Sequence, residues 1–315
     1  MQKFNFIKGH MSGNEILLLA EKGNTTEKEM VEYGVQILNR PHLGGHQIGF
    51  LEAVDNCRKI RAKIVDVTEE DFLPMCGGLT QVLGHALIQT QIDQTLDYRP
   101  EDAGKTPLVT DSGTVFISTK NPDQEFNVWT TLHPVLKSIY KKGIEQINLS
   151  GVRAVKVGDN LAINGSDLKE KYPSIKLEKF DDHTRSVIVD IQNLFLEDIL
   201  EGRREVCTLP IYDLNPARNG DARVIFPNHL PTEHVEPACG TGSLLTAVAM
   251  IEEGFVSDGT DKIDIKFESG GSATSIGGPD ITRIKLSISN GKIKTATFSH
   301  NFVRLLAEGE LWAGN

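Results

Sequence analysis

The sequence predicts a mixed α/β protein built from two pseudo-symmetric halves, each a curved mixed sheet wrapped around a central helix. The first observation is an internal repeat, because MCGGLTQVLGHALI (residues 75–88) returns as ACGTGSLLTAVAMI (residues 238–251), with Cys76 aligned on Cys239. The second is that strand-like segments outnumber helical ones and often follow one another directly. This order argues against a purely parallel sheet of βαβ units.

Composition restricts the class of protein. The chain has 315 residues, of which 39% are apolar and 24% charged, so it can bury two ordinary cores. Its net charge of -10 argues against a nucleic-acid surface, which needs clustered Lys and Arg. The start MQKFNFIKGH lacks the apolar segment of a signal peptide, and the longest aliphatic run, residues 16–20, is too short to span a bilayer. We therefore expect a cytoplasmic protein that binds neither nucleic acid nor membrane.

The first elements are a strand pair and a capped helix. Residues 4–20 read as two strands separated by a turn at Ser12-Gly13-Asn14. A helix is expected from residue 25 or 26 to about Asn39, with Glu29 three residues after Thr26 in the pattern of a capping box. Strands are then expected at 50–54 and 58–67, and the second of these alternates as a half-buried strand should.

The two repeated segments predict the central helices. After Cys76 the apolar residues follow helical spacing and form a stripe: Leu79, Val82, Leu83, Ala86 and Leu87. After Cys239 the helix is apolar almost all round, which is typical of a helix that a sheet surrounds.

The remaining elements alternate between strands and short helices. Strands are expected at 114–119, 153–159, 186–192, 205–214, 222–226, 261–269, 282–289, 292–299 and 302–312, and helices near 134–142 and 167–172. The Asn290-Gly291 pair is a strong signal for a two-residue hairpin turn. The Gly/Ser-rich segment 270–278 is read either as a linker or as an anion-binding loop. We expect one half to contain residues 1–121 and 300–315 and the other to contain residues 122–299.

Two of the four cysteines are candidates for chemistry. Cys57 and Cys207 lie beside or within strand-like runs, where a small incidental residue is the simpler interpretation. Cys76 and Cys239 each open a helix at a glycine-rich turn, where unpaired N–H groups and the helix dipole favour a thiolate or a bound carboxylate. Either cysteine alone could be a small residue in a tight turn. Their equal places in the repeat favour a functional pair.

In these features the chain resembles the members of one superfamily. They are diaminopimelate epimerase, proline racemase, the methylaconitate and methylitaconate isomerases, and the phenazine-biosynthesis isomerase-like proteins. FIKGHMSGNEILLL is similar to the start of diaminopimelate epimerases, in which Asn14 would line the pocket. MCGG and ACGTGS resemble the two catalytic cysteine motifs, and KIKTATFSHNFVRLLAEGELW resembles the end of methylaconitate-type isomerases. The resemblance implies the diaminopimelate epimerase-like fold and an isomerase that needs neither pyridoxal phosphate nor a metal ion.

In this interpretation Cys76 and Cys239 are the catalytic acid and base on a small carboxylate substrate. N–H groups at the two helix starts would stabilise the charge that develops when the α-proton leaves. The candidate substrate-binding residues are Asn14, His46, Gln47, Gly77, Gly78, Glu236, Gly240, Thr241 and Gly242. Asn228 and His234 are weaker candidates in the same loops, and His85 is expected to be structural. A zinc site lacks the usual ligand spacing.

Four hypotheses for the function follow. The first is a racemase or epimerase of a small amino or hydroxy acid, and the second is a double-bond isomerase of an unsaturated di- or tricarboxylate. The third is a thiol-redox protein with a Cys76–Cys239 disulfide, and the fourth a non-catalytic carboxylate-binding protein. Diaminopimelate itself is not the expected substrate, because VDVTEEDF and IFPNHLPTEH replace that enzyme's signatures. Domain closure around the substrate is expected. The oligomeric state is left open, with a homodimer as one option.

Overall fold

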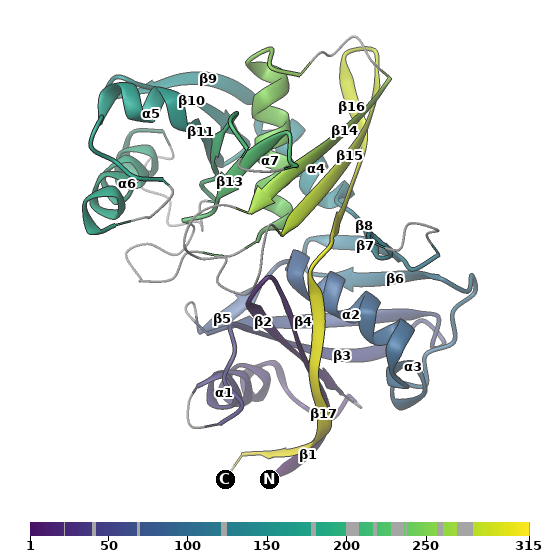
Figure 1. The fold of residues 1–315 in the computed structure, drawn as a ribbon. Helices are drawn as coiled ribbons and strands as arrows, with labels where there is room; N and C mark the ends of the chain where they lie inside the picture. The colour runs from purple at the N-terminus through teal and green to yellow at the C-terminus, as the bar shows by residue number, and fades with distance from the viewer. Residues whose placement is uncertain are drawn as a thin grey trace. The chain divides into compact units, whose positions relative to one another are not determined.

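The chain divides into two compact units. Unit 1 contains Met1–Pro134 and Ser299–Asn315, and unit 2 contains Val135–Phe298 (Figure 1). The computed structural model describes residues 1–21, 23–39, 42–67, 70–120, 125–177, 181–199, 208–216, 219–227, 236, 238–256, 261–269 and 280–314. Within these ranges, no helix is long and apolar enough to cross a bilayer.

Unit 1 is a mixed sheet with three helices among its described residues. Its strands are β1 (Gln2–Met11), β2 (Asn14–Ala20), β3 (Gln47–Val54), β4 (Lys59–Asp66), β5 (Asp71–Leu73), β6 (Lys105–Thr110), β7 (Gly113–Ser118), β8 (Trp129–Thr131) and β17 (Val303–Ala313). Its helices are α1 (Glu27–Leu38), α2 (Gly77–Gln89) and α3 (Ile92–Thr95).

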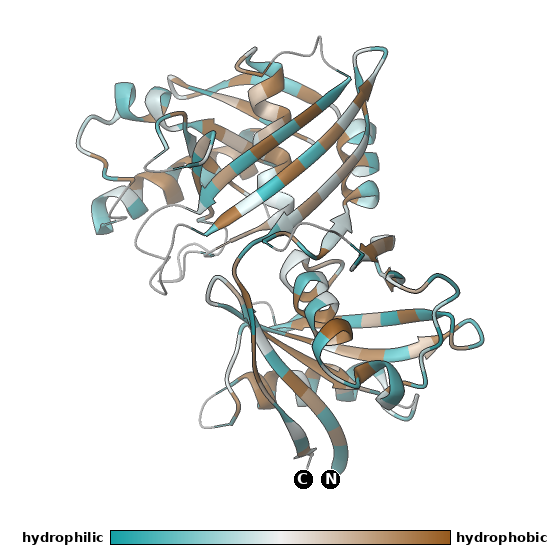
Figure 2. Cartoon of the chain, turned by 45° about the vertical axis from the view of Figure 1, so that its right-hand side comes forward, coloured by the Kyte–Doolittle hydropathy of each residue, from teal (hydrophilic) through white to brown (hydrophobic). Residues whose placement is uncertain are grey.

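Unit 2 is a second mixed sheet with its own helices. Its strands are β9 (Ile144–Leu149), β10 (Val152–Val157), β11 (Asn160–Asn164), β12 (Ile211–Asp213), β13 (Ala222–Ile225), β14 (Lys262–Ser269), β15 (Ile281–Ser289) and β16 (Lys292–His300), of which the last two residues belong to unit 1. Its helical segments are α4 (His133–Lys142), α5 (Gly165–Lys171), α6 (Asp182–Leu194), the π-helical turn η1 (Phe195–Ile199) and α7 (Gly240–Glu252). Figure 2 shows alternating hydropathy along β14 and β15, as expected for strands with one buried face.

The two units repeat one sequence of strand pairings. In unit 1, β1–β2 is antiparallel, β2–β3 parallel, β3–β4 antiparallel, β4–β6 parallel and β6–β7 antiparallel. In unit 2 the same alternation runs through β10–β11, β11–β12, β12–β13, β13–β14 and β14–β15. The connection from β4 to β6 contains α2, and the connection from β13 to β14 contains α7. The repeat in the sequence is therefore a repeat of the fold, and the expected mixed α/β class is confirmed.

Helices α2 and α7 are the buried centres of their units. Every residue of α7 from Gly242 to Met250 is buried, which confirms the prediction from its all-round apolar sequence. The sequence of helix α2 shows an apolar stripe, and in the structure the helix is buried all round from Gly78 to Ala86, because it packs on β1, β2, β3, β7, β8 and β17. Gly84 permits this packing, since a Cβ there would lie 2.4 Å from Cγ1 of Val128.

Local signals in the sequence predicted several turns and caps correctly. Ser12 and Gly13 have φ of 52° and 93° in the turn between β1 and β2. The capping box of α1 is complete, because Thr26 Oγ1 accepts the N–H of Glu29 while Glu29 Oε2 accepts the N–H of Thr26. Asn290, with φ of 54°, begins the expected hairpin turn between β15 and β16.

The strand predicted at residues 186–192 is wrong, because this segment belongs to α6. Its β-branched residues favour a strand, but Asp181 caps a helix through its Oδ1, which accepts the N–H of Thr184 at 3.0 Å. The buried residues then follow helical spacing: Thr184, Val187, Ile188, Ile191, Gln192 and Phe195. In the strand predicted at 205–214, only Ile211–Asp213 is a strand among the described residues, and Cys207 lies outside them.

Candidate active site

Cys76 is the N-cap residue of α2. Its backbone is extended, with φ -134° and ψ 119°, and its Sγ accepts the N–H of Leu79 at 3.3 Å. The S–H of Cys76 donates to Oε1 of Gln47 at 3.1 Å. Only 6% of Cys76 is exposed, so its sulfur is buried within unit 1, in contact with this backbone donor and this side-chain acceptor.

Cys239 is the N-cap residue of α7 and repeats this geometry in unit 2. Its φ is -137° and its ψ 117°, and its Sγ accepts the N–H of Gly242 at 3.3 Å. In both units the sulfur thus occupies the place of the oxygen in a Ser or Thr cap. The positive end of the helix dipole lies beside each sulfur, which favours a thiolate there.

The predicted anion donors occupy the first turns of these two helices. Gly77 and Gly78 are the first residues of α2, and Gly240 and Thr241 are the first residues of α7. N–H groups at such positions have no carbonyl partner within their own helix, so they can bind an oxyanion. The sequence also predicted the N–H of Gly242 as a donor to substrate. In the structure this N–H donates to the sulfur of Cys239.

Packing also requires glycine at the start of α7. A Cβ on Gly240 would lie 2.8 Å from the ring of Phe298, and one on Gly242 would lie 2.6 Å from the ring of Phe226. Glu236 precedes α7, and its backbone N–H donates to the carbonyl of Phe226 at 3.0 Å in an isolated bridge just after β13. Asn228 and His234 lie outside the described residues.

Two of the predicted substrate-binding residues of unit 1 lie at the start of α2. The amide nitrogen of Asn14 is 3.5 Å from where a Cβ on Gly78 would stand, and Asn14 is 1% exposed. Gln47, at the start of β3, holds Cys76 through its carbonyl oxygen. His46 is half-buried, and its Nδ1 accepts the N–H of Glu15 at 2.9 Å, which joins the start of β3 to β2.

Asp66 is a buried member of this site that was not predicted. Its Oδ2 accepts the Nε2 hydrogen of Gln47 at 2.8 Å, and only 2% of the residue is exposed. The alternation along β4 contains a signal for it, because Ile60, Ala62 and Ile64 point inward and residue 66 continues their face. A carboxylate in an inward position of a strand indicates a specific polar partner.

Other cysteines and histidines have different surroundings. Cys57 lies in the turn between β3 and β4, where its thiol contacts the carboxylate of Asp97. His85 is buried within α2, where burial and then the charge of Arg304 lower its pKa to about 4. In the part of the chain with defined positions, no three His, Cys, Asp or Glu side chains are grouped as metal ligands.

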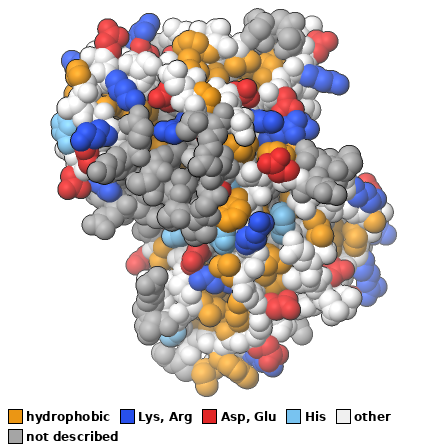
Figure 3. Space-filling model, viewed as in Figure 1, with side chains coloured by type: hydrophobic (Ala, Val, Ile, Leu, Met, Phe, Trp, Pro, Cys, Tyr) orange, Lys and Arg blue, Asp and Glu red, His pale blue; other side chains and the backbone are white. Residues whose placement is uncertain are grey.

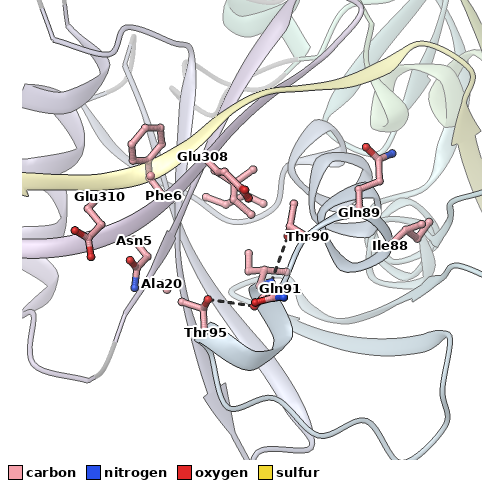
Figure 4. A pocket seen from close by; sticks show the side chains of 14 residues that line it. Asn5, Phe6, Ala20, Ile88, Gln89, Thr90, Gln91, Thr95, Glu308 and Glu310 are labelled. Carbon is pink, nitrogen blue, oxygen red and sulfur yellow. Dashed lines mark hydrogen bonds between the residues drawn. The ribbon is translucent and has the colours of Figure 1, made fainter.

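A cavity of about 770 Å³ in unit 1 is unsuited to a carboxylate (Figure 4). It lies at the C-terminal end of α2, next to Ile88–Gln91, whereas Cys76 lies at the N-terminal end, about 20 Å away along the helix. The C-terminal end of a helix is electronegative, and Glu308 and Glu310 also line the cavity. Figure 3 shows basic and acidic side chains interspersed on the visible face of the described residues.

Comparisons with solved structures identify the fold. A phenazine biosynthesis protein of the PhzF family from Bacillus anthracis matches with a TM-score of 0.65 and 11% identity, over 99% of this chain and 100% of that one. A hydroxyproline epimerase from Agrobacterium vitis, solved with trans-4-hydroxy-L-proline bound, matches with a TM-score of 0.62 and 12% identity over 98% and 92% of the chains. The chain has the diaminopimelate epimerase-like fold.

A methylitaconate isomerase has a similar structure, which matches with a TM-score of 0.60 and 10% identity over 99% of this chain and 96% of that one. No protein-family model and no curated protein sequence matches the chain. At identities of 10–12% the likeness establishes the fold. The fold expected from the two cysteine motifs is thereby confirmed.

Proposed function

We propose that this protein is a racemase or epimerase that moves the α-proton of a small amino or hydroxy acid without pyridoxal phosphate. Cys76 and Cys239 are its acid and base. The observation that carries this proposal is the duplicated corner, in which a cysteine caps a buried helix with nearly equal φ and ψ and an equal S···N distance of 3.3 Å in each unit. Two cysteines with matched settings suit a reaction that must run in both directions.

The chemistry follows from the groups at the helix starts. When the α-proton leaves, negative charge develops on the carboxylate oxygens of the substrate. The N–H groups of the first two residues of α2 and of α7 would bind these oxygens, and because the helix holds them in place they need little reorganisation during the reaction. One thiolate removes the proton and the other cysteine, as a thiol, returns one with inverted configuration. The pair therefore shares one proton, and the two titrations are coupled.

A double-bond isomerase of an unsaturated di- or tricarboxylate is the second candidate. It is favoured by the similarity of residues 292–312 to methylaconitate-type isomerases and by the methylitaconate isomerase among the matched structures. The same acid and base would then move a proton between two carbons of one substrate. The anion-binding helix starts serve both reactions equally.

Deuterium incorporation separates these candidates. The protein is incubated in D₂O with panels of 2-amino acids, 2-hydroxy acids and unsaturated dicarboxylates, and the products are followed by proton NMR and chiral chromatography. Label at an inverted stereocentre supports the racemase or epimerase, and label with a migrated alkene supports the double-bond isomerase. Cys57→Ala is the matched control, because this thiol lies in a turn remote from both helix starts in the sequence.

Two outcomes would overturn both candidates. If no acid exchanges deuterium and Cys76 and Cys239 form a reversible disulfide, the protein is a thiol-redox protein. If no acid exchanges but a carboxylate binds, the helix starts serve binding alone. Exchange that persists in Cys76→Ala or in Cys239→Ala would refute the mechanism with two thiols.

A further inference from the structure

We propose that the cavity at the C-terminal end of α2 is a binding site for a small organic cation, a primary ammonium group on a short aliphatic chain. The cavity belongs to unit 1 and lies at the end of α2 opposite to Cys76, so the inference does not depend on the proposed reaction. Its volume of about 770 Å³ is within the range of sites that bind small molecules.

Strand register gives the cavity an apolar floor with two carboxylates at its edge (Figure 4). Strand β1 lies between β17 and β2, and two of its residues have one partner on each side. The two rows are Glu310–Asn5–Ala20 and Glu308–Ile7–Leu18. Residues that lie opposite each other, or two apart on one strand, share a face of the sheet. The apolar members of the rows are buried and the two glutamates are exposed, so an apolar chain can lie on the floor while a charged group reaches the glutamates.

The cavity carries negative charge without matching positive charge. Among the described residues that line it, two are glutamates and none is Lys, Arg or His. Glu310 pairs with Lys3 at 2.7 Å, whereas Glu308 has no ion-pair partner in the described part of the chain. The last carbonyl groups of α2 have no partner within the helix and form the negative end of its dipole. These charges favour a cation and disfavour an anion.

The polar side chains at the end of α2 leave mainly acceptors for a ligand. The hydroxyl groups of Thr90 and Thr95 each donate to a backbone carbonyl four residues earlier, at 2.8 and 3.1 Å. The amide nitrogen of Gln89 lies 3.2 Å from Nδ1 of His85, whose pKa is lowered to about 4 by burial and then by the charge of Arg304, so this ring is neutral and can accept at neutral pH. Hydrogens of these three side chains are thus used within the protein. An ammonium group supplies three donors and no acceptor, which suits the oxygens that remain.

The dimensions of the floor suit a short chain. From β17 across β1 to β2 the floor spans two strand spacings, about 10 Å. An ammonium group bound to Glu308 would therefore place its chain over Ile7 and toward Leu18, in the same row. Burial of that chain would add affinity to the charge–charge attraction, which is weak for an exposed carboxylate alone.

The test compares three ligands that share a chain and differ in their head group. Pentylamine, 1-pentanol and pentanoate are titrated into the full chain by calorimetry at neutral pH and low ionic strength. Pentylamine is protonated there, because alkyl ammonium groups lose their proton near pH 10. It should bind about fivefold more tightly than 1-pentanol, lose affinity as salt is added, and bind where pentanoate does not. If pentylamine does not bind, or binds no more tightly than 1-pentanol, the proposal is overturned.

Substitution of Glu308 locates the bound amine. Glu308→Gln removes one exposed negative charge and should weaken pentylamine binding about fivefold. Glu308→Lys supplies an ammonium group from the chain itself and should abolish binding. Glu145→Gln is the matched control, because it removes the same charge from an exposed position on β9 of unit 2 and should leave the affinity unchanged. An affinity that is unchanged in Glu308→Gln or retained in Glu308→Lys, or that falls equally in Glu145→Gln, would overturn the assignment to this cavity.

Discussion

Cys76 and Cys239 cap the two central helices with the same backbone conformation, φ/ψ of -134°/119° and -137°/117°. Each sulfur accepts the N–H of the residue three positions later at 3.3 Å. A thiol is a weaker cap than a hydroxyl, so this position exchanges some helix stability for a nucleophilic and ionisable group.

Replacement of either cysteine by serine should separate stability from chemistry. Cys76→Ser and Cys239→Ser should each lower turnover at least ~100-fold, the usual contribution of a positioned general acid or base. Their melting temperatures should be equal to or above that of the natural protein, because serine is a preferred N-cap. Cys76→Ala and Cys239→Ala should lose the same activity and about 1 kcal/mol of stability as well. Calorimetry with a deuterium-exchange assay measures both effects, and a serine variant that retains turnover would contradict them.

Glu253 should make the stability of unit 2 fall as the pH rises. Burial, and then the charge of Asp167, raises the pKa of Glu253 from 4.5 to about 7, while Arg153 opposes this shift. Since the raised pKa means that the folded state binds this proton more tightly, its contribution is complete below pH 4.5 and is lost as the pH rises through about 7. We expect a loss of order 1 kcal/mol, after discounting for solvent around this half-exposed group. Urea unfolding across this range should show the decline, and Glu253→Gln should abolish it.

His300 should have the opposite effect in unit 1. Burial, followed by the charges of His10 and His85, lowers the pKa of His300 from 6.5 to about 3. The unfolded chain therefore binds a proton that the folded chain excludes, and stability is lost as the pH falls below 6.5 toward 3. In a plot of the free energy of unfolding against pH, His300→Asn should therefore reduce the decline on the acid side, even if the substitution also lowers stability at neutral pH. Urea unfolding at a series of pH values measures this decline. His42→Asn, at an exposed position, is the control and should leave the decline unchanged.

Gly84 should tolerate no side chain, since α2 passes so close to unit 1's other elements. A Cβ there would lie 2.4 Å from Cγ1 of Val128 and 3.0 Å from Cγ2 of Ile117. Gly84→Ala should destabilise the protein by about 1–3 kcal/mol, despite the better helix propensity of alanine. The double variant Gly84→Ala with Val128→Ala should recover part of this loss in chemical denaturation. Additive losses would show that the clash is relieved elsewhere.

Much of the local structure could be predicted because its signals are short. The capping box of Thr26 and Glu29, the turn at Ser12-Gly13 and the Asn290-Gly291 hairpin each depend on residues within a few positions of one another. The segment 186–192 shows where this fails. Its β-branched residues favour a strand, but the cap at Asp181 and burial spaced by three and four residues make it a helix.

By itself, the sequence determined the fold class, the two helix starts and the cysteine at each, since a repeat and a glycine-rich turn are written in adjacent residues. Only the tertiary structure decided which distant side chains meet there. Asp66 became part of the site because the register of β3 and β4 places it opposite Gln47, 19 positions earlier in the chain. Strand register depends on how the whole sheet packs, so a pairing of this kind cannot be read from either segment alone.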